Sequence, residues 1–215
     1  MTEMILQGIF ETLYMTIVST LIAYVIGLPL GVILVISDRS GIKPMPTLNA
    51  VISFVVNIFR SIPFLILLVA IIPFTRLVVG TMLGSTAAIV PLTVAAAPFV
   101  ARMVETSLKE VDSGVVEAAE SMGASVWQII RKVLLPEAKP SLITNATVTV
   151  ITVLGYSAMA GFTGGGGLGD IATRYGLYKF DTATMWLVVL IIVVIVQVLQ
   201  EVGLRIAKVT DNRTR

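Results

Sequence analysis

The chain has 215 residues, of which 56% are hydrophobic and 13% are charged, and its mean hydropathy is +0.97. Charged residues make up about a quarter of an ordinary soluble domain, so this composition excludes one. The chain contains no cysteine and no histidine, which removes disulfides, thiol chemistry, a histidine base and the usual zinc ligands. We therefore expect an all-α membrane protein with no metal site, no catalytic residues and no nucleic-acid partner.

Five apolar segments have the length needed to cross a bilayer as helices. They lie at about 13–36, 48–74, 86–103, 141–160 and 182–204. In the first segment, Gly27 and Gly31 flank Pro29, a pattern that predicts either a kink or the close approach of a second helix. The whole chain, residues 1–215, is predicted to be one transmembrane domain with five spans.

The second segment contains a charge and a helix breaker. Pro63 cannot donate a hydrogen bond to the carbonyl of Phe59, so the helix should break there. A charge such as that of Arg60 is costly at this depth unless it faces protein or water. Two interpretations remain. Either Arg60 and Ser61 line a translocation path, or Arg60 has a structural role and pairs with an acid such as Glu105.

Residues 112–136, between the third and fourth segments, are neither membrane-like nor a simple loop. Asp112 or Ser113 is suited to cap a first short helix, and Gly123 falls where helices commonly end, because glycine adopts the left-handed conformation at no steric cost. Ser125 and Gln128 have the spacing of a capping box, which predicts the start of a second short helix.

The second short helix is predicted to have one apolar face and to stop at Pro136. That face consists of Val126, Ile129, Ile130 and Val133. An amphipathic hairpin lying on the lipid surface would show the same spacing, so periodicity alone leaves the role of this loop open.

The same stretch resembles the EAA loop of the permeases of ABC importers. Glu117-Ala118-Ala119 is followed by Gly123 and then by Val133-x-Leu135-Pro136, with valine where the family usually has isoleucine. In that family the loop is the cytoplasmic element that a cleft on the ATPase subunit receives. The resemblance implies that the following residues couple this chain to an ATPase: Glu117, Ala118, Ala119, Gly123, Ser125, Trp127, Ile130, Leu135 and Pro136.

Further runs resemble the permease subunit of the methionine ABC importers. They lie at 57–64, 72–76, 88–93, 97–105 and 155–161. The resemblance implies a type I importer, in which two copies of this chain assemble with two cytoplasmic ATPases and an extracytoplasmic binding protein, often a lipoprotein. It implies methionine, including D-methionine and related derivatives, as the transported substrate. ATP and magnesium would then be bound by the ATPase and not by this chain. A different amino acid or a small peptide is the alternative substrate.

Tyr156 and Met159 are three residues apart on the fourth segment. If two copies of the chain face each other, their Met159 side chains would form a soft constriction of the path, with Tyr156 beside it. Methionine and tyrosine at helical spacing are also common in packed cores. The sequence therefore leaves a gate and a structural role open for this pair.

The distribution of basic residues predicts the orientation of the chain. With five spans, one side of the membrane receives residues 37–47, residues 102–139 and the C-terminal tail with Arg213 and Arg215, and these hold most of the 15 lysines and arginines. That side is predicted to be the cytoplasm of a bacterial cell with a multi-pass protein in its inner membrane, and the N-terminus is predicted to lie outside.

Two other classes of protein fit the sequence less well. A secondary transporter should have inverted repeats and acidic residues near the middle of its spans, and these spans offer no central aspartate or glutamate. A membrane scaffold that only binds a cytoplasmic partner would use an amphipathic loop, but it would not need kinked helices around a buried arginine.

Overall fold

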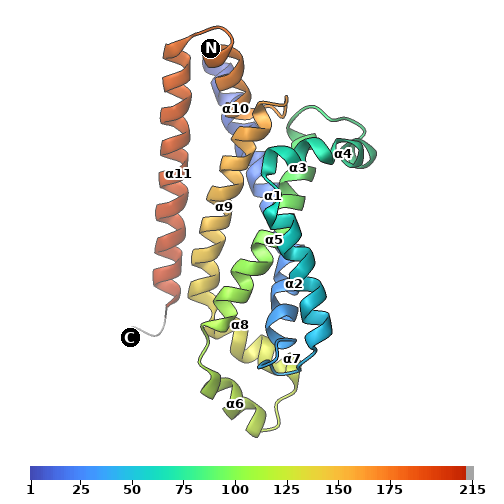
Figure 1. Cartoon of the computed structure of the whole chain (residues 1–215). Coiled ribbons are helices and arrows are strands. Elements are labelled where there is room, and N and C mark those ends of the chain that lie inside the picture. The colour runs from blue at the N-terminus through green and yellow to red at the C-terminus, as the bar shows by residue number, and fades with distance from the viewer. Residues whose placement is uncertain (212–215) are drawn as a thin grey trace.

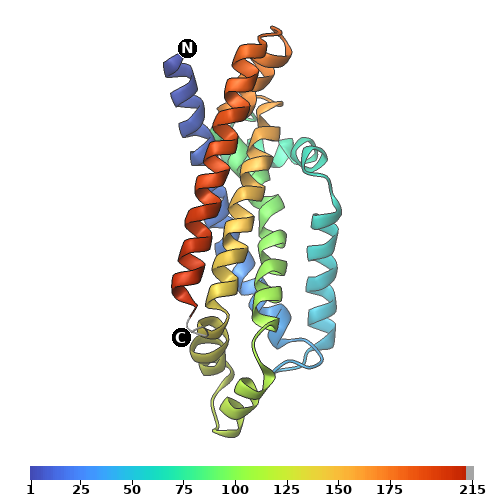
Figure 2. The same cartoon turned by 90° about the vertical axis from the view of Figure 1, so that its left-hand side faces the viewer.

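The computed structural model describes residues 1–211, and within that range it consists of helices and connecting turns without a β-strand (Figure 1). Arg213 and Arg215 of the basic tail lie outside the described residues. Four helices are long and apolar enough to cross a membrane: α1 (Thr2–Ile36), α5 (Ser85–Lys109), α9 (Lys139–Gly161) and α11 (Thr182–Thr210). They run lengthwise beside one another, and the start of α1 and the end of α11 lie at opposite ends of the bundle (Figure 2).

The second predicted segment, about 48–74, is a broken helix. α2 (Pro46–Ser61) ends just before Pro63, and α3 (Phe64–Ala70) leaves it at an angle of 99°. The break predicted from Pro63 is therefore confirmed. α4 (Ile72–Val79) follows at once and extends beyond residue 74, where the predicted segment ends. Figure 1 shows α3 and α4 turned out to one side of the bundle.

The core is organised around the contact between α1 and α5. A Cβ atom added at Gly27 would lie 2.6 Å from the carbonyl oxygen of Ala97 and 2.7 Å from Cβ of Val100. Gly31 meets α5 in the same way, one turn further along. α1 continues as a helix through Pro29. Of the two outcomes that the two glycines and the proline allow, the structure shows the close approach of a second helix.

The bundle is buried on the inside and apolar on the outside, as a helical membrane protein requires. In the most apolar 18-residue stretch of each helix, 61% of the central α5 is buried inside the bundle, whereas only 11% of the peripheral α11 is. The exposed surface of α11 consists largely of apolar side chains, among them Trp186 and Leu190. These side chains are suited to lipid.

The connection between α9 and α11 lies at the end of the bundle opposite residues 112–136 and is largely helical (Figure 1). α10 (Gly167–Ile171) and a π-helical turn, η2 (Ala172–Leu177), lie there. Glu11 and Thr12 of α1 cap α10: the Glu11 carboxylate accepts a 2.7 Å hydrogen bond from the backbone N–H of Gly167, and the Thr12 hydroxyl accepts one of 2.9 Å from that of Leu168. Side chains of α1, at the start of the chain, therefore accept hydrogen bonds from the first backbone N–H groups of α10, which have no partner within that helix.

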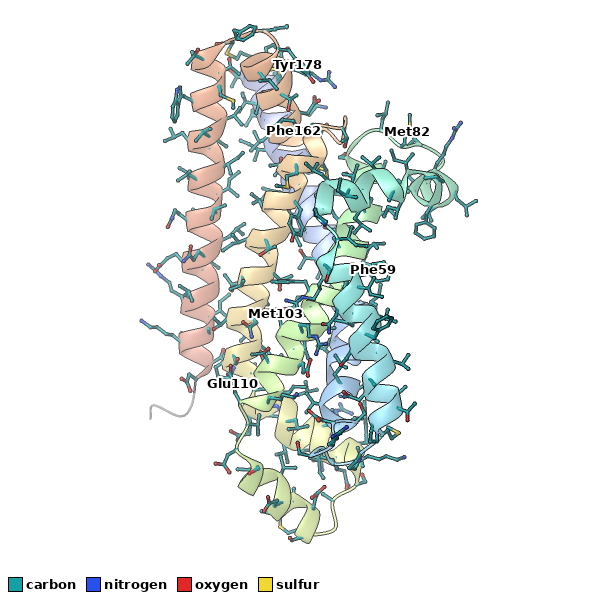
Figure 3. All side chains as sticks on the ribbon, in the orientation of Figure 1. Phe59, Met82, Met103, Glu110, Phe162 and Tyr178 are labelled. Carbon is teal, nitrogen blue, oxygen red and sulfur yellow. The ribbon has the colours of Figure 1, made fainter. Side chains whose placement is uncertain are left out.

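Figure 3 places Phe162 and Tyr178 toward this end and Glu110 toward the other. The two polar ends of the bundle are thus separated by the length of the long helices.

Candidate functional site

The loop of residues 112–136 projects from one end of the bundle and forms short helices with a break between them (Figure 1). α6 (Ser113–Ser121) begins after Asp112, whose carboxylate accepts a 2.7 Å hydrogen bond from the backbone N–H of Gly114. Gly123 has a φ of 77° and so adopts the left-handed conformation predicted for it. The chain therefore reverses sharply at a position that a residue with a side chain would strain.

The second helix starts with the predicted capping box. The backbone N–H of Ser125 donates to Oε1 of Gln128 at 2.8 Å, and the Ser125 hydroxyl accepts from the backbone N–H of Gln128 at 3.4 Å. This helix, α7 (Val126–Ile129), anchors the loop, because Ile129 and Ile130 are buried against the core. The other two predicted apolar residues, Val126 and Val133, pack against that core as well.

The end of the second helix differs from the prediction. The sequence predicts a stop at Pro136, but a π-helical turn, η1 (Ile130–Leu134), leads into α8 (Leu135–Glu137), which contains the proline. Pro136 lies in the first turn of α8. A backbone N–H has no partner within the helix at that position, so proline is tolerated there.

Part of the 112–136 loop faces outward with apolar side chains. Trp127 is 66% exposed and Met122 is 82% exposed. Ile130 and Ala119 lie on the inner side and are buried. An exposed tryptophan and methionine on a loop whose other face is anchored in the core form a surface suited to a protein partner.

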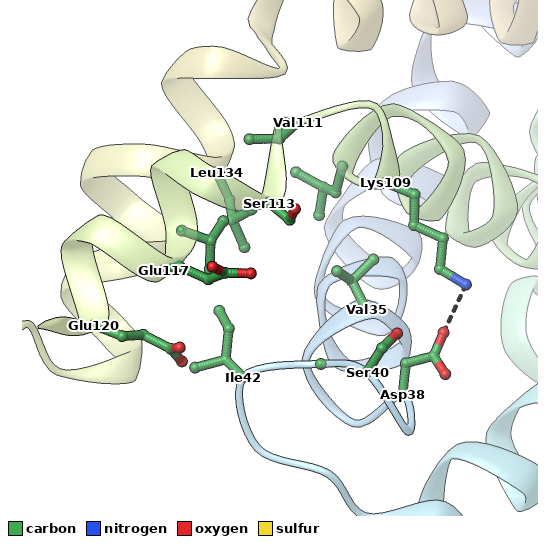
Figure 4. A pocket seen from close by; sticks show the side chains of 13 residues that line it. Val35, Asp38, Ser40, Ile42, Lys109, Val111, Ser113, Glu117, Glu120 and Leu134 are labelled. Atoms are coloured by element: carbon green, nitrogen blue, oxygen red, sulfur yellow. Dashed lines mark ion pairs between the residues drawn. The ribbon is translucent and has the colours of Figure 1, made fainter.

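The acidic residues of α6 face a cavity. Glu117 and Glu120 point into a space of about 290 Å³ between α6, the turn after α1 and the end of α5 (Figure 4). The opposite wall of this cavity includes Asp38 and Lys109, whose carboxylate and ammonium groups are 2.8 Å apart.

The Asp38–Lys109 ion pair holds both groups in their charged forms. The ammonium group of Lys109 lowers the pKa of Asp38 below the usual value of 3.8. The Asp38 carboxylate, with a further contribution from Glu105, raises the pKa of Lys109 above 10.5 against the opposing effect of burial. The pair therefore remains ionised on both sides of neutral pH.

The pairing of Arg60 with Glu105, which the sequence left open, is not found in the structure. Glu105 is only 8% exposed and is bound by both Arg102 (2.5 Å) and Lys109 (2.9 Å). Both carboxylate oxygens are thus taken by cations other than Arg60. Over residues 1–211, Arg60 is exposed and forms no ion pair.

The structure places the remaining predicted path residues on two helices. Ser61 lies at the end of α2 and donates a 2.8 Å hydrogen bond to the carbonyl of Asn57. Tyr156 of α9 is half-buried and its ring stacks on that of Phe64, whereas Met159 is 43% exposed. Tyr156 therefore packs in the core, while Met159 faces outward one turn away.

Sequence reasoning missed the contact between Asp38 and Lys109. Asp38 looks like part of a polar turn, and nothing near it in the chain indicates a partner. The spacing of Glu105 and Lys109 indicates that these two side chains share a helix face and can pair. It does not indicate that Lys109 also binds Asp38.

Comparison with known proteins agrees with this geometry. The family model described as "Binding-protein-dependent transport system inner membrane component" matches residues 27–215. The chain belongs to this family, whose members are membrane subunits of ABC importers. Its fold is that of a type I ABC importer permease, and it is a multi-pass transporter subunit of the inner membrane and not an enzyme.

The relatives and solved structures that match the chain give more detail. A Vibrio cholerae protein named "Probable D-methionine transport system permease protein MetI" is 50% identical over 99% of this chain and 94% of its own length. The D-methionine transport system permease protein MetI of Escherichia coli K12 is 56% identical over 75% of this chain and 74% of its own length.

Among solved structures, an inward-facing conformation of the MetNI methionine ABC transporter matches with a TM-score of 0.97 and 50% identity, over 99% of this chain and 98% of that one. An amino acid ABC transporter crystallised with histidines has a TM-score of 0.79 over 96% of this chain and 94% of its own. Its 20% identity supports the fold alone.

Proposed function

We propose that this chain is the membrane-spanning subunit of an ATP-driven importer that carries methionine, including D-methionine, across the bacterial inner membrane. The observation that carries the proposal is the 112–136 loop, hereafter the docking loop. Its capped helices, its left-handed Gly123 and its exposed Trp127 form a projecting surface at one end of the bundle. The names of relatives about 50% identical to this chain supply the substrate.

The partners follow from the same loop. A cytoplasmic ATPase receives the docking loop and binds ATP and magnesium, and this chain carries neither. Two copies of the chain form a homodimer, since five spans are few to enclose an aqueous path and twofold pairing is the simplest symmetric solution. A binding protein outside the membrane, anchored as a lipoprotein, delivers the substrate.

The orientation puts the docking loop in the cytoplasm and the N-terminus outside. It rests on the excess of basic residues at the docking-loop end and in the tail. In agreement with this orientation, α1 starts at the opposite end of the bundle from the docking loop (Figure 1).

Transport proceeds by alternating access. Closure of the ATPase pair on ATP displaces the docking loops, and the two bundles switch as nearly rigid bodies from an inward-open to an outward-open packing. In the docking loop, Glu117, Ala118 and Ala119 lie on α6, Ser125 caps α7, and Leu135 and Pro136 begin α8. The chain itself forms and breaks no covalent bond.

The path lies between the two copies. An exposed stripe on α9, formed by Val148, Gly155 and Met159, has no neighbour over Gly155 within 4 Å. Met159 from each copy closes the path at this stripe. Arg60 and Ser61 line the path from α2, and both are exposed. An exposed arginine within a span is stable only where it meets water, and the path supplies that water.

The test is uptake of labelled methionine by vesicles that contain this chain with the ATPase and binding protein encoded beside it. We expect uptake that requires ATP and that excess methionine, but no other amino acid, abolishes. If loaded binding protein stimulated ATP hydrolysis but no methionine were taken up, the chain would still belong to an importer, and its substrate would be another amino acid or a small peptide. If a correctly assembled complex gave neither signal, the proposed role of the docking loop would be wrong.

A further inference from the structure

Helix α2 is attached to its own protomer mainly by polar contacts. Of its 16 residues, only Val56 is buried. At its start, the Asn49 amide donates to the carbonyl of Leu34 at 2.7 Å and to the Ser37 hydroxyl at 3.1 Å. A helix with so little buried apolar surface is held weakly by packing, so its polar contacts determine its position.

The strongest of these contacts come from two cations on α5 that are both bound to Glu105. This carboxylate is 8% exposed, and its two oxygens bind the Arg102 guanidinium and the Lys109 ammonium. Loss of either cation would leave a buried charge partly unsatisfied, which is more costly than loss of a surface pair. The three side chains therefore behave as one unit.

Each of the two cations also reaches a second element. Arg102 donates to the Asn57 side-chain oxygen at 2.9 Å and to the Ser53 carbonyl at 3.4 Å, both on α2. Lys109 binds Asp38 in the turn that leads into α2. α5 thus holds α2 at its middle and holds the turn that precedes it.

The same group of side chains borders the docking loop. Asp38 and Lys109 form one wall of the cavity into which Glu117 and Glu120 of α6 project (Figure 4). Within residues 1–211, Glu117 and Glu120 make no ion pair across this cavity, but the docking loop shares one apolar cluster with Leu108, the neighbour of Lys109, through Ala119, Ile130 and Leu134. Apolar packing therefore links the docking loop to the end of α5, and the cluster of charges links α5 to the helix that ends at the break before Pro63.

We propose that Asp38, Arg102, Glu105 and Lys109 form a charge clamp that makes α2 follow the docking loop during the transport cycle. These are positioning residues, since none of them is placed in the path. The inference rests on the proposed function, because it assumes that ATP moves the docking loop. The buried carboxylate at the centre of the clamp makes opening costly, so α5, the turn and α2 move together and the change of shape falls on the break at Pro63.

The first experiment compares Lys109→Met with the conservative Lys109→Arg in the full complex with ATPase and binding protein. We expect Lys109→Met to keep ATP hydrolysis but to lower methionine uptake per ATP by at least about fivefold, the lower range of coupling between sites. Lys109→Arg retains the charge and should restore coupling. At the other end of the ion pair, Asp38→Asn should lower uptake per ATP as Lys109→Met does, and Asp38→Glu should retain it as Lys109→Arg does.

The matched control is Glu201→Gln on α11. Glu201 and Arg205 form an exposed ion pair within one helix, at 2.6 Å, and within residues 1–211 neither has a hydrogen bond or ion pair to a second element. Its loss should leave uptake per ATP unchanged. A merely structural role of the clamp would lower the amount of assembled complex and both activities in proportion. Equal uptake per ATP in Lys109→Met and wild type would overturn the inference.

A second measurement does not depend on the substrate. Hydrogen exchange of the backbone of residues 46–61 is compared with and without a non-hydrolysable ATP analogue. In the wild-type complex we expect the nucleotide to change exchange in both the docking loop and α2, and in Lys109→Met only in the docking loop. A change in α2 that persists in Lys109→Met would overturn the clamp, whereas a wild-type complex that takes up no methionine bears on the proposed substrate alone.

Discussion

The ring of Phe64 stacks on the ring of Tyr156, with centroids 4.8 Å apart and planes within 4° of parallel. Phe64 is the first residue of α3, directly after the bend, and Tyr156 lies on α9 one turn before Met159. Such a pair contributes about 0.5–1.5 kcal/mol beyond the area it buries. The bent segment and the proposed gate are therefore held in register by one aromatic contact.

The gate predicts a specific defect in Met159→Ala. Shortening this exposed side chain should leave a gap between the two copies, so the variant should hydrolyse ATP but transport less methionine per ATP. Val193→Ala removes a similarly exposed side chain from α11, outside this stripe, and is the control. Unchanged uptake and unchanged coupling in Met159→Ala would place Met159 in the dimer contact and not in the gate.

The docking loop predicts loss of transport in Trp127→Ala. A buried tryptophan contributes roughly 4–6 kcal/mol before the costs of binding, at about 25 cal/mol per Å² over 150–250 Å². The variant should insert into the membrane normally and fail to retain the ATPase in a pull-down. Trp186→Ala, which removes a tryptophan of similar exposure from α11, should assemble and transport.

Gly123→Asp should have the same phenotype for a different reason. Gly123 has a φ of 77°, so any side chain there strains the reversal between α6 and α7. Nothing lies within 4 Å of the position that a Cβ would occupy, so the defect would be one of backbone geometry and not of space. Normal transport by Gly123→Asp in the uptake assay would contradict the docking assignment.

The contact between α1 and α5 predicts a large difference between two glycines. Gly27→Ala places a Cβ against the Ala97 carbonyl, which cannot move away without moving α5, and should destabilise the protein by about 1–3 kcal/mol. Gly155→Ala meets nothing within 4 Å and should be neutral or stabilising by up to about 1 kcal/mol. Thermal unfolding of both variants in detergent measures the difference.

Arg60 predicts opposite effects on insertion and on transport. Arg60→Gln removes a charge that costs about 2.5–3.5 kcal/mol on insertion scales, so the variant should insert at least as well as wild type. If Arg60 lines the path, uptake should fall in Arg60→Gln and recover in Arg60→Lys. A variant that transports normally but unfolds at a lower temperature would assign Arg60 a structural role.

The ion pair between Asp38 and Lys109 is expected to contribute the same stabilisation over a wide range of pH. The lowered pKa of Asp38 gives a stabilisation that is present above its ordinary pKa and is lost as pH falls through the lowered value. The raised pKa of Lys109 gives one that is present below its ordinary pKa and is lost as pH rises through the raised value. The difference in melting temperature between wild type and Asp38→Asn should therefore be constant from about pH 5 to about pH 9. A difference that vanished near neutral pH would contradict the assignment.

Local signals in the sequence were enough to predict the docking loop. The caps at Asp112 and Ser125 and the reversal at Gly123 each depend on residues no more than three positions away. The bend at Pro63 is local as well, since it follows from one missing N–H group.

α4 was missed because its breakers lie at its ends. Pro73 occupies the first turn, where a missing N–H group leaves no helical bond unmade, and Gly80 ends the helix at a φ of 83°. The sequence alone cannot distinguish these positions from breaks within a loop.

The charge clamp was missed for the opposite reason, because its members come from different parts of the chain. Asp38 and Lys109 meet only when the turn after α1 folds against the end of α5. Their pairing is a property of the tertiary structure, which no local pattern specifies.

The cap that Glu11 and Thr12 provide for α10 has a consequence for the biogenesis of the protein. The hydrogen bonds join residues 156 positions apart, so the helix that accepts them leaves the ribosome long before the helix that donates them. Until α10 arrives, the Glu11 carboxylate and the Thr12 hydroxyl have no such donors. A nascent chain that stops after α9 thus leaves Glu11 with the hydrogen bond from Gln7 in its own helix but without the one from α10, so this end of the bundle is completed only when most of the chain has been made.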